Sequence, residues 1–125
     1  MKAKQLNFII SLKVYPFDVM VSFGETDKEL QSKLNKYSVD YSDADWKFED
    51  IGLGRAVMFS SGQFLLRYKK IPISIDDYGH LQHEIFHIVH FLMHRINTPL
   101  NLDTCETWAY LIGYITSEVY KKLQK

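Results

Sequence analysis

The spacing of apolar residues changes near the middle of the chain, and this change limits the possible folds more than any other feature. Alternating or short apolar runs, typical of β-strands, occur in four segments, 6–14, 17–23, 55–60 and 63–70. Ser61-Gly62, between the last two segments, is typical of a hairpin turn. From about residue 74 onward, apolar residues recur three and four positions apart, as in a helix. The sequence therefore predicts a sheet followed by helices.

Capping residues and chain breakers predict where three helices begin and end. Thr26 and Glu29 have the spacing of a capping box, and Asn97-Thr98-Pro99 is a stop signal. The predicted helices run from Thr26 to about Tyr37, from Ser74 or Asp76 to about Arg95 or Ile96, and from Asp103 or Thr104 to about Lys121. We therefore expect an α+β fold, in which a small antiparallel sheet of three to four strands packs against three helices.

The composition suits one domain, spanning residues 1–125, with a sizeable core. The chain has 125 residues, of which 46% are hydrophobic and 14% aromatic, so it does not belong to the disordered class. Residues 38–53 are polar and irregular, and we expect a loop there. Its Trp46 and Phe48 are expected to fold back on the core, although a role facing a substrate is the alternative.

Charge, cysteine content and hydropathy exclude several classes of function. Fifteen basic residues balance fifteen acidic ones, and no basic stripe is interleaved with aromatics, so we expect no nucleic-acid partner. Cys105 is the only cysteine, which suits a reducing compartment, and we expect its thiol to be buried and inert. Ser11 and Lys13 interrupt the N-terminal apolar run, which argues against a signal peptide. No run is long enough to cross a membrane, and a cytoplasmic protein is expected.

The predicted second helix contains His83-Glu84-Ile85-Phe86-His87, an HExxH motif. Histidines four apart on a helix lie on one face, one turn apart, which suits two ligands at about 2.0–2.1 Å from a Zn²⁺ ion. The glutamate lies beside that face, where it can take a proton from water as a general base. The motif therefore predicts His83 and His87 as metal ligands and Glu84 as a catalytic residue.

All five histidines of the protein fall on one stripe of this helix. At an ideal 100° per residue the stripe is about 80° wide, and it is separate from the apolar face. His90 and His94 continue it beyond the motif. They either face solvent, or line the cleft and hydrogen-bond a ligand or transition-state oxygen.

The third metal ligand is expected on the last helix. The downstream carboxylates are Asp103, Glu106 and Glu118. Glu106 is preferred because Ala109 and Gly113 share its face, and small residues there would let the two helices approach closely. Alternatively, Asp103 and Glu106 have the spacing of a capping box, so that Glu106 would cap its own helix.

Two further residues near Glu106 are candidates for a supporting role. Asp103 is expected to orient a ligand histidine by a hydrogen bond. Tyr110, one turn after Glu106, is expected either to donate to a developing oxyanion or to pack in the core.

The motif and the run Glu106-Thr107-Trp108-Ala109-Tyr110-Leu111-Ile112-Gly113-Tyr114 resemble the zincin metallopeptidases whose third ligand is a glutamate on the next helix, the gluzincin type. More closely, the whole chain resembles small metallopeptidases encoded by tailed phages and prophages. The resemblance implies a minimal zincin-like core, zinc at His83, His87 and Glu106, and Glu84 as base. It departs from many gluzincins in having Tyr110 where they have an aspartate, and it shows no sure oxyanion-stabilising residue.

These observations predict a zinc-dependent hydrolase, a metallopeptidase that acts on a peptide or protein substrate. An exposed strand of residues 55–60 or 63–68 would pair with the extended substrate. The alternative is a non-catalytic module in which zinc stabilises the fold, with a phage or host protein as partner. If the protein is phage-encoded, its compartment would be the cytoplasm of the bacterial host. A further alternative is a coincidental motif without metal.

Overall fold

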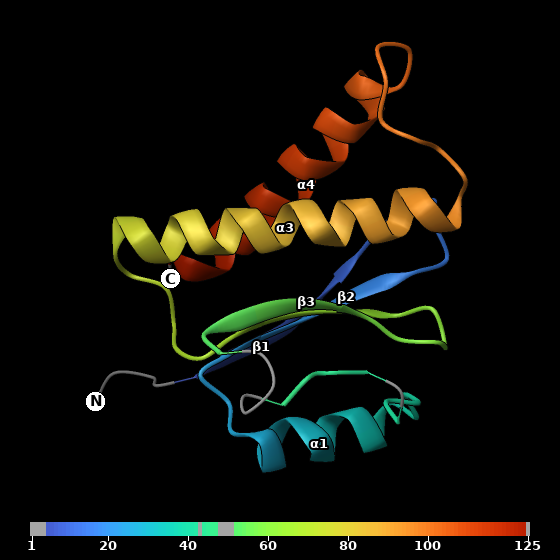
Figure 1. Ribbon diagram of the computed structural model, residues 1–125. Helices are drawn as coiled ribbons and strands as arrows, with labels where there is room; N and C mark the ends of the chain where they lie inside the picture. The colour runs from blue at the N-terminus through green and yellow to red at the C-terminus, as the bar shows by residue number, and fades with distance from the viewer. Residues whose placement is uncertain (1–4, 43, 48–51, 125) are drawn as a thin grey trace.

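A computed structural model describes residues 5–42, 44–47 and 52–124 of the chain. Within these residues, a four-stranded sheet separates one helix on one face from two long helices on the other (Figure 1). The strands are β1 (Leu6–Ser11), β2 (Asp18–Phe23), β3 (Gly54–Met58) and β4 (Phe64–Tyr68). The helices are α1 (Asp27–Lys36), α3 (Ile75–Arg95) and α4 (Cys105–Leu123). The expected α+β class, with four strands and three helices, is confirmed.

The strand order is β1-β2-β4-β3, so β1 and β3 are the edges of the sheet. β1 pairs with β2, and β3 with β4, in antiparallel fashion, but β2 and β4 run parallel. The sheet is therefore mixed, and the expectation of purely antiparallel pairing was wrong for this one pair. The burial of the two hairpin strands agrees with their places in the strand order. All five residues of β4 are buried, as in a central strand, whereas β3, at the edge, exposes Arg55.

Each face of the sheet has its own core. On one face, the side chains of β2 and β4 pack against α3 and α4 through residues such as Val21, Leu66 and Ile85. On the other face, Met20 and Leu65 contact the buried face of α1. Trp46 joins this second core at 2% exposure, which confirms that it folds back, while Phe48 lies outside the described residues.

Local signals determine where the helices begin and end. The capping box of Thr26 and Glu29 is present, and a second box at the start of α3 joins Ser74 to Asp77. Beyond the end of α3, Asn97 adopts a positive φ of 56°, which turns the chain away. Thr104 is the N-cap of α4 and makes no side-chain capping bond. None of the helices in the described part of the chain is long and apolar enough to cross a membrane.

The prediction that Cys105 is buried was wrong. Its thiol is exposed at the first residue of α4, because the apolar face that holds this helix against α3 lies elsewhere on its circumference.

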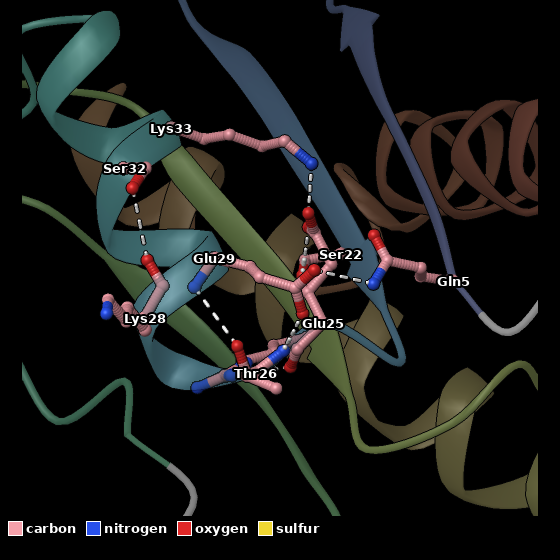
Figure 2. A network of polar contacts seen from close by, with 9 residues as sticks. Gln5, Ser22, Glu25, Thr26, Lys28, Glu29, Ser32 and Lys33 are labelled. Carbon is pink, nitrogen blue, oxygen red and sulfur yellow. Dashed lines mark hydrogen bonds and ion pairs between the residues drawn. The ribbon is translucent and has the colours of Figure 1, made fainter.

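A buried polar network fastens the start of α1 to the sheet. Glu25, at 1% exposure, accepts a hydrogen bond from the Ser22 hydroxyl at 2.7 Å and pairs with the ammonium group of Lys33 (Figure 2). Arg67 of β4, fully buried, donates to the Asp27 carboxylate at 2.6 Å and to the backbone carbonyls of Trp46 and Glu25. Buried charges of this kind are tolerated only when they are paired and hydrogen-bonded.

Candidate metal centre and hydrolytic site

The two histidines of the HExxH motif converge as predicted. α3 places the Nε2 atoms of His83 and His87 only 3.1 Å apart. Two nitrogen ligands of one tetrahedral zinc ion, each at about 2.05 Å, are separated by roughly 3.3 Å. The side chain of His83 is 67% exposed, so the pair is open to solvent. The separation of the two nitrogens is therefore close to that of two ligands of a single ion.

Glu84 is held between the histidine pair and the edge of the sheet. Its Oε1 atom accepts a hydrogen bond of 2.9 Å from the backbone N–H of Ala56 in β3. Its Oε2 atom lies 3.9 Å from Nε2 of His83, and the side chain is 18% exposed. One carboxylate oxygen is thus anchored by the backbone, and the other remains beside the histidine pair.

A second group of polar side chains lies one turn before the motif. The Tyr68 hydroxyl contacts Oδ1 of Asp77 at 3.0 Å and Nδ1 of His80 at 3.3 Å. Burial and the neighbouring Asp77 carboxylate raise the pKa of Tyr68 to about 12, so the phenol is protonated at neutral pH. Tyr68 comes from β4 and the other two residues from α3.

Asp77 is the charged end of this group. Its Oδ2 atom accepts hydrogen bonds from the backbone N–H groups of Ile73 and Ser74, both at 3.1 Å, and lies 3.2 Å from the Lys70 ammonium. These donors, the Ile73 N–H first among them, hold the pKa of Asp77 well below its usual range despite burial. Asp77 is therefore a carboxylate under all ordinary conditions.

Because the pKa of Asp77 is depressed in the folded protein, its ionised form stabilises the fold above the unfolded-state pKa of about 4. This contribution is lost as pH falls through the folded-state value. The Asp77→Asn variant should therefore be less stable than the parent at pH 7, and the difference should shrink as the pH falls from 5 to 3. Urea midpoints at several pH values measure it, and a difference that is constant over this range would contradict the expectation.

His83 and Glu84 of the motif share one surface hollow of about 420 Å³ with Tyr68 and His80 of this second group. Its walls come from the start of β3, the end of β4 and the first half of α3. The lining residues are Leu53, Gly54, Tyr68, Gly79, His80, His83 and Glu84. A ligand in this hollow would meet both a predicted metal ligand and the predicted base.

The structure does not bring Glu106 to the histidine pair. Glu106 is exposed in the first turn of α4 and lines a different hollow, together with Lys13 and Tyr110. Trp108, two positions later and thus on nearly the opposite side of the helix, is buried and packs on Phe86 of α3, with ring centroids 5.8 Å apart.

The small-residue face of α4 does not approach α3. A Cβ atom built on Gly113 would meet nothing within 4 Å, so the expected close contact of the two helices at Ala109 and Gly113 was wrong. In the described ranges, 5–42, 44–47 and 52–124, no three His, Cys, Asp or Glu side chains are grouped to hold a metal ion. Glu106 as third ligand stays a prediction.

The remaining candidates line other hollows or lie in the loop before α4. Tyr110 is 73% exposed beside Glu106, and Asp103 is exposed in the loop before α4. His90 and His94 line a third hollow, of about 350 Å³, between the end of α3 and the loop that follows it. There His90 packs on the Trp108 ring at a centroid distance of 5.8 Å.

No family model, curated protein or solved structure matches this chain. A function for this chain therefore has to be inferred from the geometry of the site. Tyr68 and Asp77 were not predicted as site residues from the sequence, and His80 was identified there only as one of the five histidines of the stripe. The position of His80 on the stripe was a usable signal, whereas the approach of Tyr68 from β4 is a long-range contact without a local signature.

Proposed function

We propose that this protein is a zinc-dependent hydrolase that cleaves peptide bonds. The observation that supports the proposal most directly is the convergence of His83 and His87, at 3.1 Å between Nε2 atoms, next to a carboxylate anchored on an edge strand. A zinc ion held by this pair would supply Lewis-acid activation of water and of the scissile carbonyl.

Glu84 is suited to the role of general base. With Oε1 fixed by the Ala56 N–H, the carboxylate presents Oε2 on the side of His83. It would take a proton from the attacking water and deliver it to the leaving amine.

β3 is suited to hold an extended peptide. It is an edge of the sheet, whereas β4 lies between two strands, so of the two candidate strands only β3 has a side that no strand of the described residues pairs with. In its antiparallel pairing with β4, alternate residues direct their backbone groups outward, and the bond from Ala56 to Glu84 shows that Gly54, Ala56 and Met58 are those residues. Because the Ala56 N–H already donates to Glu84, a substrate strand added here would use the backbone groups of Gly54 and Met58 and the Ala56 carbonyl, and it would pass Glu84.

A non-catalytic, zinc-stabilised binding module is the second candidate. It is favoured by apolar side chains that are exposed around the loop before α4: Leu102 is 94% exposed and Leu100 54%. A phage or host protein that covers them would explain their exposure. In this case the metal would have four protein ligands and no open position.

Zinc content tests the metal centre. After removal of bound metal and reconstitution, the parent should hold about one zinc per chain by elemental analysis. His83→Ala should lose most of it, because one of the two converging nitrogens is gone. His94→Ala is the matched control, since it removes an exposed histidine of the same helix that lines another hollow. A parent that takes up no zinc would overturn the proposal.

The Glu106→Ala variant decides the third ligand in the same experiment. Loss of zinc from this variant would mean that the first turn of α4 rotates toward the pair when the metal binds. Full retention would mean that another group completes the site and that Glu106 belongs to the exposed face of α4.

A further inference from the structure

The hydrogen-bonded group of Asp77, Tyr68 and His80 has no part in the mechanism described so far. It ends in the hollow that contains His83 and Glu84, one turn before the motif. Tyr68 is 1% exposed and Asp77 5% exposed, whereas the His80 side chain reaches the open space of the hollow. The buried Asp77 carboxylate and the buried Tyr68 phenol thus lie behind the accessible imidazole of His80.

The positions of the protons in this group follow from the partners. The Asp77 carboxylate already faces two backbone N–H groups and an ammonium group, so it only accepts hydrogen bonds. The single proton of the Tyr68 hydroxyl therefore goes to Asp77 at 3.0 Å. The contact of 3.3 Å between the Tyr68 oxygen and Nδ1 of His80 then requires the proton on Nδ1. In neutral His80, Nε2 is left with a lone pair.

We propose that Asp77 and Tyr68 fix the tautomer of His80 so that Nε2 accepts a hydrogen bond from a backbone N–H of the substrate in this hollow. The choice of an amide donor follows from the surroundings. Glu84 on the same wall is also an acceptor, and Gly54 presents an outward-facing backbone of β3 along which an extended peptide would lie. His80 thus contributes to substrate binding, and Tyr68 acts as its positioning residue.

The tautomer is tested without any activity measurement. In long-range ¹H–¹⁵N NMR spectra of the metal-free protein above pH 7.5, chosen as about one unit above the usual histidine pKa, His80 should show the Nδ1–H tautomer. In Tyr68→Phe, which keeps the ring and removes the hydroxyl, His80 should shift toward the Nε2–H form, which is the form preferred in water. An Nε2–H tautomer in the parent, or no change in the variant, would overturn the inference.

The contact between His80 and the substrate rests on the proposed function. It is tested with two variants of His80 whose side-chain amides differ in length. The probe is a quenched fluorescent peptide with the sequence at which the parent cuts β-casein. His80→Asn, which loses the distal acceptor, should raise KM about three- to tenfold, as expected for one hydrogen bond. His80→Gln, whose amide oxygen reaches the position of Nε2, should restore most of the affinity. Equal KM values for parent and His80→Asn would overturn the contact.

The two proposals fail in different ways. If the parent protein cuts no peptide, the proposed hydrolase activity is wrong. The NMR result then decides by itself whether His80 is held in the tautomer whose Nε2 can accept a hydrogen bond. If the parent cuts the peptide but carries His80 as the Nε2–H tautomer, the hydrolase proposal stands, whereas the fixed tautomer and the acceptor role of His80 are both wrong.

Discussion

Glu84→Gln should lower the rate of peptide hydrolysis by about 10²–10⁴-fold, the usual contribution of a general base, and leave zinc bound. Glutamine cannot take a proton from water at neutral pH. It retains a carbonyl oxygen at the position of Oε1, so the 2.9 Å hydrogen bond from the Ala56 N–H is preserved. Neither His83 nor His87 is altered, and the metal affinity of the pair is therefore expected to be unchanged.

The measurement is kcat on casein or on a derived peptide, together with zinc content and the melting temperature of the same samples. Glu118→Gln is the matched control, because it makes the same chemical change on α4, where the carboxylate pairs with Lys121 on the protein surface. This control should cleave at the parental rate. If Glu84→Gln cleaves as fast as Glu118→Gln, Glu84 is not the base and the hydrolytic mechanism proposed here is wrong.

The parts of the fold that the sequence predicted correctly depend on short-range interactions. The capping box at Thr26 joins residues three apart, and the His83–His87 pair joins residues four apart, so helix geometry alone determines them. The parallel pairing of β2 with β4 is different. The alternation of apolar residues identifies a strand, but it does not identify the neighbour of that strand.

The orientation of α4 about its own axis shows why the third ligand was harder to predict. Glu106, Ala109 and Gly113 share a face, and that face was expected to approach α3. The competing face carries Trp108, Ile115 and Val119, all buried, and its larger apolar area determines which side of the helix packs inward. Small residues permit a close approach of helices, whereas large apolar residues supply the free energy that orients them.

Arg67 was not identified from the sequence, yet its replacement should have the largest effect on stability. In Arg67→Met the side chain keeps similar length and loses the guanidinium, which donates to Asp27 and to the carbonyls of Trp46 and Glu25. Removing one partner from a buried charged network costs about 3–5 kcal/mol. The Asp27 side chain is 37% exposed, so water can solvate part of the remaining charge, and we expect the lower end of this range.

Small domains typically have an unfolding free energy of about 5–15 kcal/mol, so a loss of about 3 kcal/mol is a large fraction of the total. It should lower the melting temperature by roughly 10–15 °C. Arg55→Met is the matched control. Arg55 is the register partner of Arg67 on β3 but is exposed, so its replacement should change the free energy of unfolding by less than about 0.5 kcal/mol. Chemical denaturation of both variants measures the difference. Equal stabilities would show that the buried guanidinium does not hold α1 and the loop containing Trp46 against the sheet, and that the apolar contacts of Leu30 and Leu34 are sufficient to do so.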